Sequence, residues 1–194
     1  MKKLILCLLV ILFTGCNSTT TVENPNGKSL AYKYFNSKNY DGSIYNLKLK
    51  TENSNITVSR QNNNVYYENK GNMDLVILEK NGVRYNINSN DKTYSKEDIL
   101  KEENYVYGIL PDDINIFKNK GYKTGKERIG IYNYVFETYN YDGVSATYYF
   151  KKSDLKYIRK QTDTENLIYE VISFDTKKKN NVFKIPKNYM ELTY

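Results

Sequence analysis

Cys16 has the most specific chemical context of any residue in this chain of 194 residues. It follows the segment Leu12-Phe13-Thr14-Gly15, which closes an unbroken apolar run that begins at Leu4. Small residues directly before a cysteine at the end of such a run are typical of a bacterial lipobox. In that motif the cysteine sulfur carries a diacylglyceryl group, and the chain is cut just before the cysteine. We therefore expect signal cleavage after Gly15 and lipidation of Cys16.

The residues before Cys16 have the features of a secretory signal peptide. Lys2 and Lys3 form a short basic region, and ten apolar residues follow, whereas a membrane-spanning helix needs about 20. Two or more acyl chains hold a protein stably on a bilayer. The pattern predicts a protein anchored to the extracytoplasmic face of the cell membrane through Cys16. The alternative is an ordinary signal peptide that contains an incidental cysteine.

Two of the side chains that catalytic mechanisms often use, those of histidine and cysteine, are missing from the rest of the chain. There is no histidine, and the only other cysteine, Cys7, is removed with the signal peptide. These absences exclude imidazole catalysis, histidine-bound zinc and thiol nucleophiles. The adjacent carboxylates Asp112 and Asp113 are open candidates for catalysis, as are the lysine-neighbouring serines Ser95 and Ser153, but such residues are common in turns. We expect no enzyme activity, no metal and no cofactor.

The charge and the aromatic content describe the kind of surface to expect. Without Lys2 and Lys3, 27 of the 29 basic residues remain against 22 acidic residues, a net charge of +5. A basic protein near an anionic membrane is drawn to it by weak, salt-sensitive attraction. Tyrosine, with 21 residues against 7 phenylalanines, indicates either a ring-lined groove or simply a tyrosine-rich composition. Tyrosines among basic residues would also suit single-stranded nucleic acid, but the export signal argues against that partner.

Two segments are expected before the sheet begins. Residues 16–29 are polar and contain Pro25 and Gly27, which predicts a flexible, lipid-anchored tether. The folded domain is expected to span residues 30–194. Its first element is a helix, because Leu30, Tyr34 and Phe35 recur at helical spacing, and Ser29 precedes them as a capping residue.

Alternating apolar and polar residues then predict about ten antiparallel strands. Asn81-Gly82 and Asp142-Gly143 are strong hairpin signals between them. Two helices are expected in the middle of the chain, a polar one over 96–103 and an apolar one between Leu110 and Gly121. The fold class predicted is α+β, a curved, half-closed antiparallel sheet with two or three short helices on its concave side.

This order of elements resembles the LolA/LolB-like superfamily of lipoprotein-sorting and lipid-carrier domains. Three segments carry the resemblance. The first has a Gly turn followed by Lys-Thr-Tyr, the second is a central meander with a Leu-x-x-Ile strand, and the third is a closing Phe-x-Ile-Pro segment. They lie at Asn81–Asp98, Thr124–Lys160 and Val182–Thr193. Lipid-anchored members of that group, the LolB-like and LppX-like proteins, are the most similar to a chain with a lipobox.

The resemblance implies a half-barrel whose apolar cavity takes acyl chains beneath a helical lid. The candidate lid is the apolar helix with Ile114, Ile116 and Phe117. The candidates for the concave wall are apolar strand positions, each of which has ordinary core packing as its alternative. These positions are Leu47, Leu49, Val58, Val76, Leu78, Tyr85 and Ile87.

The function expected is therefore non-catalytic. The protein would bind an apolar or amphipathic ligand, such as a lipid or a lipoprotein acyl chain, or act as an envelope chaperone. The alternative is an envelope interaction module that binds a protein or an anionic polymer and has no cavity. A continuous apolar cavity of some hundreds of Å³ would favour ligand binding, whereas a core filled by Tyr and Leu side chains would favour the module.

Overall fold

One large antiparallel sheet makes up most of the protein. The computed structural model describes residues 19–71, 74–99 and 109–193. In these ranges the chain forms thirteen strands and two short helices, α1 (Leu30–Ser37) and α2 (Asn115–Asn119). The strands are β1 (Thr20–Val22), β2 (Ile44–Lys50), β3 (Ser54–Gln61), β4 (Asn64–Gly71), β5 (Leu75–Lys80), β6 (Val83–Asn88), β7 (Thr93–Asp98), β8 (Tyr122–Ile129), β9 (Tyr132–Tyr141), β10 (Val144–Lys151), β11 (Asp154–Gln161), β12 (Asn166–Asp175) and β13 (Met190–Glu191).

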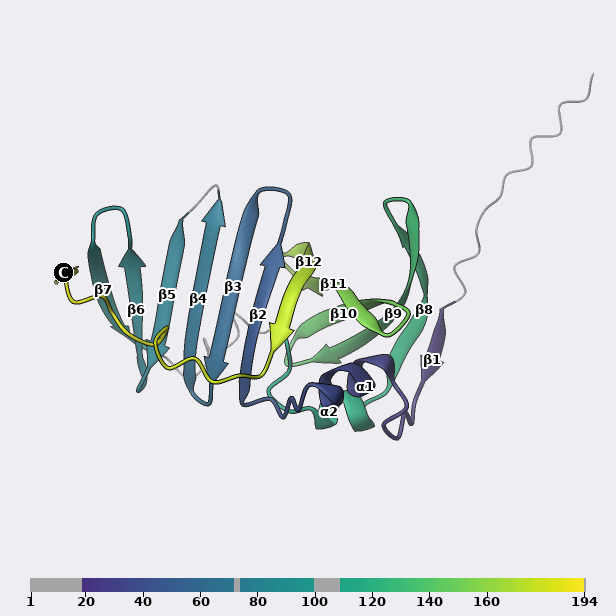
Figure 1. Cartoon of the computed structure of the whole chain (residues 1–194). Helices are drawn as coiled ribbons and strands as arrows, with labels where there is room; N and C mark the ends of the chain where they lie inside the picture. The colour runs from purple at the N-terminus through teal and green to yellow at the C-terminus, as the bar shows by residue number, and fades with distance from the viewer. Residues whose placement is uncertain (1–18, 72–73, 100–108, 194) are drawn as a thin grey trace, which may run out of the picture.

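The sheet consists of two meanders that join at their ends. Strands β2 to β7 form the first and β8 to β12 the second, and β12 pairs antiparallel with β2. The short strands β1 and β13 add to the two edges, on β8 and β7. Figure 1 shows the first meander as a nearly flat wall and the second curled around α1 and α2. The predicted curved antiparallel sheet is confirmed at this level, but the described residues are mainly β, with more strands than the ten or so expected.

Two of the predicted hairpin turns have the backbone that their residues favour. Asn81 and Gly82 have φ values of 54° and 80°, and Asp142 and Gly143 have values of 50° and 73°. Positive φ at both central residues is the requirement of a type I′ turn, whose twist matches that of the flanking strands. These turns set the registers of β5 with β6 and of β9 with β10.

The inside of the curled meander is packed with aromatic rings. Phe117 of α2 stacks on Phe35 of α1 with ring centroids 4.8 Å apart, and it meets Tyr139 and Tyr148 edge-on at 5.1 Å. Phe35, Phe117, Tyr139 and Tyr148 are all fully buried. Such ring pairs add to the free energy of apolar burial. The two helices therefore fill the concave side of this meander.

This packing corrects the prediction of a lid. Ile114 directly precedes α2, Ile116 is half-buried, and Phe117 is part of the main core cluster. A lid residue would cover a space, whereas Phe117 occupies that space. The apolar face of the helix was correctly predicted, but the same pattern suits a core helix and a lid equally well.

The start of α1 is held by a cap and by a buried carboxylate. Ser29 accepts a hydrogen bond from the Tyr32 amide at 3.1 Å, as expected of a capping residue, and its hydroxyl donates to the Phe117 carbonyl at 2.9 Å. Glu137 of β9 accepts hydrogen bonds from the amides of Leu30 and Ala31 at 2.7 and 2.8 Å. Burial raises the pKa of Glu137, and these two amide hydrogen bonds offset the rise only in part.

Glu137 should make stability depend on pH. Its pKa is raised in the folded state, so folding binds a proton between the unfolded-state pKa, about 4.3, and the folded-state pKa. The free energy of unfolding should therefore fall as pH rises through that window, with a limiting slope of about 1.4 kcal/mol per pH unit. Urea unfolding of the wild type and of Glu137→Gln between pH 4 and 7 measures this. A difference between the two proteins that is constant with pH would contradict it.

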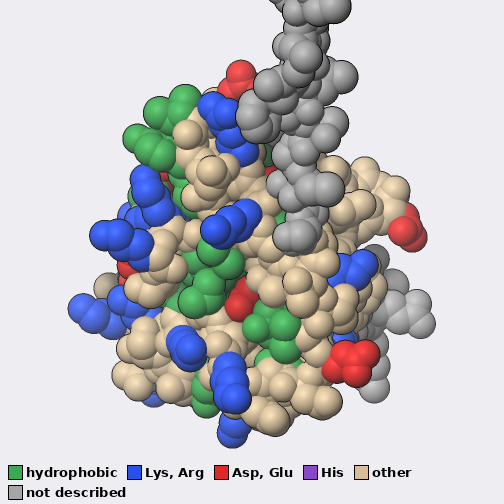
Figure 2. Space-filling view, turned by 90° about the vertical axis from the view of Figure 1, so that its right-hand side faces the viewer, with side chains coloured by type: hydrophobic (Ala, Val, Ile, Leu, Met, Phe, Trp, Pro, Cys, Tyr) green, Lys and Arg blue, Asp and Glu red, His purple; other side chains and the backbone are tan. Residues whose placement is uncertain are grey.

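Two segments differ from their predicted structure. Within the expected tether over 16–29, β1 pairs with β8, and the amide of Gly27 donates to the carbonyl of Lys118 at 2.9 Å. From Thr20 onward this segment is thus part of the fold, on the face that Figure 2 shows, where Lys and Arg side chains are prominent. The predicted helix over 96–103 is also wrong at its start, because β7 continues to Asp98. Residues 100–103 lie outside the described residues.

Candidate functional site

The seven residues predicted to form one concave wall lie on opposite faces of the sheet. Val58 pairs with Tyr67, whereas Leu78 pairs with Tyr66. Neighbouring residues of a strand point to opposite faces, so Val58 and Leu78 cannot share a wall. The structure groups Leu47, Leu49 and Val58 in the main core, and Val76, Leu78, Ile87 and the half-buried Tyr85 in a second cluster.

The second cluster is covered by the C-terminal segment. Phe183 is buried against Val76, Leu78 and Ile87, and Ile185 packs beside it. Figure 1 shows this segment crossing the flat meander after β12 on its way to β13. The wall prediction is therefore corrected: these strand residues are ordinary core, split between two layers.

A groove of about 590 Å³ lies on the other face of the flat meander. Its floor is apolar and aromatic, and its rim is mainly polar; we call it the β12 groove because the start of β12 forms one side. The floor residues are Ile56, Tyr67, Leu75, Ile77, Ile109 and Tyr169, and the rim includes Thr51, Asn53, Lys160, Glu165, Leu167 and Ile168. None of the seven predicted wall residues lines it, although Leu49 and Val58 are cross-strand partners of Ile56 and Tyr67.

The groove arises because β12 is longer than its pairing with β2. That pairing starts at Glu170, opposite Lys50, so residues 166–169 of β12 extend past the end of β2. The register Val58–Tyr67–Ile77 across β3, β4 and β5 places Ile77 on the same face as Tyr67. The groove therefore lies where β2 ends, between the apolar floor on β3 to β5 and the part of β12 that extends past β2.

Some of the polar groups that line the β12 groove are withdrawn from water. Lys160 is only 6% exposed, and its ammonium nitrogen lies 3.8 Å from the carboxylate of Glu165. Burial, followed by the negative charge of Glu165, raises the pKa of Tyr169 to about 12, and burial also raises that of Tyr67. Both hydroxyls therefore stay protonated near neutral pH. The Oδ1 atom of Asn69, another residue that lines the groove, is buried without a hydrogen-bond partner among the described residues.

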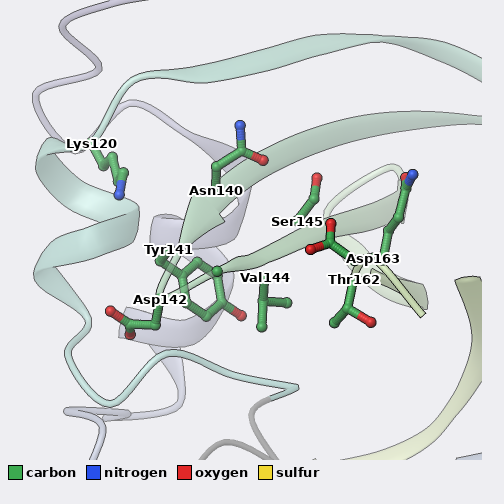
Figure 3. Close-up of a pocket in the computed structure, with 10 residues that line it drawn as sticks. Lys120, Asn140, Tyr141, Asp142, Val144, Ser145, Thr162 and Asp163 are labelled. Carbon is green, nitrogen blue, oxygen red and sulfur yellow. The ribbon is translucent and has the colours of Figure 1, made fainter. Parts of the chain in front are cut away.

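Two further hollows have polar walls. One, of about 440 Å³, lies between the β9–β10 and β11–β12 turns, and Figure 3 shows Lys120 and Asp142 at one side of it and Thr162 and Asp163 at the other. The second, of about 540 Å³, lies beside β1 and contains the Glu127–Arg159 ion pair, 2.7 Å long. Water competes well for such groups, so neither hollow suits an apolar ligand as well as the β12 groove does.

The candidate catalytic residues have structural partners. Asp112 pairs with the guanidinium of Arg60, and Asp113 accepts a hydrogen bond from the Asn115 amide at 2.8 Å at the start of α2. Ser153 lies in an exposed turn, and Lys96, which follows Ser95, binds Glu191 at 2.7 Å. Across residues 19–71, 74–99 and 109–193, no three Asp, Glu, His or Cys side chains come together as a metal site would require.

Comparison with known proteins leaves the family open. No model of a known protein family matches the chain, and no curated protein matches its sequence. The LolA/LolB-like resemblance therefore stays a prediction. Gly15 and Cys16 lie outside the described residues, and neither described helix is long and apolar enough to cross a membrane.

Proposed function

We propose that this protein is a non-catalytic lipoprotein whose β12 groove binds an apolar or amphipathic ligand. Acylated Cys16 would hold it on the extracytoplasmic face of the cell membrane. The ligand class is a lipid or a lipoprotein acyl chain, and in this proposal the half-closed sheet belongs to the LolA/LolB-like group. No nucleic acid, metal or cofactor has a part in it.

The observation that carries the proposal is the β12 groove. Ligand sites of small molecules are hollows of about 300–1,000 Å³ with apolar walls and a few placed polar groups. The β12 groove, at about 590 Å³, has an apolar floor and the buried groups of Lys160 and Asn69 at its side. An acyl chain would lie on Ile56, Leu75 and Ile77, with a polar end toward Lys160.

A second candidate function, an envelope interaction module, is favoured by the outside of β12. Ile168 and Ile172 are 38% and 54% exposed and lie four positions apart on this strand. Apolar side chains gathered in this way are typical of a protein-binding surface. The filled concave side of the curled meander also agrees with a module more than with a carrier of the half-barrel type.

Native mass spectrometry with lipid extraction separates the two functions. The protein should be produced in cells from Asn17 onward, which removes the anchor but keeps every described residue, including β1 and the Ser29 cap. Purification without detergent then leaves a ligand in place. A co-purified lipid or fatty acid at one per chain supports ligand binding, whereas an empty protein that also fails to bind an added fatty acid supports the module.

A matched pair of leucines tests whether the β12 groove is the site. Leu167 lines the groove and is 43% exposed, whereas Leu192 is 37% exposed and lies outside it. Leu167→Asp should weaken binding of the fluorescent fatty acid cis-parinaric acid by about tenfold, a loss of about 1.4 kcal/mol of apolar contact. Leu192→Asp should leave the dissociation constant unchanged. Equal effects of the two substitutions would place the ligand elsewhere.

A further inference from the structure

The chain enters the fold at one particular end of the curled meander. β1 is antiparallel to β8, and Thr20 pairs with Thr124 while Val22 pairs with Tyr122. Moving from Val22 back to Thr20 therefore follows β8 toward its own end at Ile129. Thr20 is therefore at the end of β1 that lies nearer to the turn joining β8 to β9, as the course of the strands in Figure 1 shows.

That turn is the tip of a projecting hairpin. β9 pairs with β8 from Tyr132 onward, but its pairing with β10 starts only at Val135. The end of the β8–β9 hairpin thus extends beyond the rest of the meander, and in Figure 1 it stands clear of its neighbours. We call residues 129–132 the hairpin tip.

The hairpin tip exposes apolar side chains. Ile131 is 76% exposed, more than any other large apolar side chain of the described residues, and Tyr132 is 50% exposed. The turn at Gly130 and Ile131 does not require an apolar side chain at Ile131, because Gly130 supplies its positive φ of 60°. Large exposed apolar residues at a projecting turn are costly in water and mark a contact surface.

Basic side chains surround the hairpin tip. Lys126 and Arg128 on β8 are exposed, and the ammonium nitrogen of Lys151 lies 3.6 Å from the centre of the Tyr132 ring. The acidic neighbour on β8, Glu127, is already paired with Arg159. Figure 2 shows hydrophobic side chains near the top of this side of the molecule, with Lys and Arg side chains beside them. An apolar point inside a basic ring matches the surface of an anionic bilayer.

The length of the tether brings that bilayer close. Cys16 is four residues before Thr20, so the two Cα atoms are at most about 14 Å apart. From Thr124, the partner of Thr20, to Gly130 is about 20 Å along β8. A lipidated Cys16 at the membrane surface therefore allows the hairpin tip, on the same side of the sheet, to reach the same leaflet.

We propose that the hairpin tip is a membrane-contacting element, in which Ile131 and Tyr132 enter the interface of the leaflet that holds the acyl anchor. Lys126, Arg128 and Lys151 bind its anionic headgroups. The anchor and the tip together fix the orientation of the domain, whereas an anchor alone would leave it free to rotate. This inference rests on the proposed lipidation of Cys16.

The absence of tryptophan from the chain makes a direct test possible. Tyr132→Trp places one fluorophore in the hairpin tip, and the matched control is Leu192→Trp. Leu192 follows β13, which is at the opposite edge of the sheet from β1. Twelve strand-to-strand spacings separate these two edges, about 55 Å measured along the sheet. The full mature lipoprotein is inserted into vesicles of phosphatidylglycerol and phosphatidylcholine, with and without headgroup-proximal spin-labelled lipid.

The tryptophan at position 132 should emit at shorter wavelength in vesicles and be quenched by the spin label, whereas the tryptophan at position 192 should show neither change. Adding Ile131→Asp to Tyr132→Trp should abolish the shift while the protein still floats with the vesicles. Unchanged emission at position 132 in a floating protein overturns the inference. A protein whose mass lacks the diacylglyceryl group and which does not float overturns the proposed lipidation instead.

Discussion

Replacing Cys16 by serine is expected to abolish lipidation and signal cleavage together. Serine offers no thiolate for thioether formation, so the Cys16→Ser protein should incorporate no labelled fatty acid. It should also keep residues 1–15, because in the lipobox pathway the cut follows acylation. Stable anchoring requires two or more acyl chains, and the variant retains only a short apolar run of ten residues. Fatty-acid labelling and intact-protein mass measure both effects.

Cys7 supplies the matched control for this experiment. It is the only other cysteine of the sequence, and it lies in the apolar run that signal cleavage removes. Cys7→Ser should therefore give a mature protein of unchanged mass and unchanged labelling. Labelling that survives in Cys16→Ser, or that is lost in Cys7→Ser, would show that the lipobox interpretation is wrong.

Truncating Phe117 to alanine should cause the largest loss of stability. The ring is fully buried and contacts Phe35, Tyr139 and Tyr148 at centroid distances of 4.8 to 5.1 Å. Losing a buried phenylalanine ring costs about 3–5 kcal/mol, from lost apolar burial and from the cavity left behind. That is a large share of the 5–15 kcal/mol by which a typical domain is stable. Urea unfolding followed by circular dichroism measures the change.

The neighbouring Ile116 distinguishes a core helix from a lid. Ile116 is half-buried, so Ile116→Ala should cost about 1–2 kcal/mol, roughly half the usual value for a buried isoleucine. Neither substitution should alter the affinity of the folded protein for a fatty-acid probe, because neither residue lines the β12 groove. If Phe117→Ala released the probe faster and lost little stability, the result would support the prediction that α2 is a lid.

Local pattern was enough to predict much of the sheet. The hairpins at Asn81-Gly82 and Asp142-Gly143 were predicted where the chain turns, because alternation and turn residues act over short distances. The cap at Ser29 and the helix from Leu30 follow from the same local chemistry. The predicted lipidation of Cys16 also rests on local sequence and awaits its test.

The assignment of faces could not be predicted in this way. The run from Leu75 to Leu78 is apolar at every position, so alternation does not say which side of β5 faces which layer. In the structure, Val76 and Leu78 face the C-terminal segment, whereas Leu75 and Ile77 line the β12 groove. A strand that is apolar on both faces indicates two covered or functional surfaces, and that signal could have pointed to the groove.

The sequence by itself determined two hairpin turns, the first helix and its cap, and it carries the prediction of a lipid anchor, because each depends on neighbours along the chain. Tertiary structure decided the rest. β1 joins the sheet only because the edge of β8 is there to bind it, and α2 fills a core that β9 and β10 provide. The β12 groove exists because the pairing of β12 with β2 begins only at Glu170 and Lys50, 120 positions apart in the chain, and leaves the start of β12 unpaired on that side. Such long-range registers are settled by the packing of the whole sheet, which no local pattern contains.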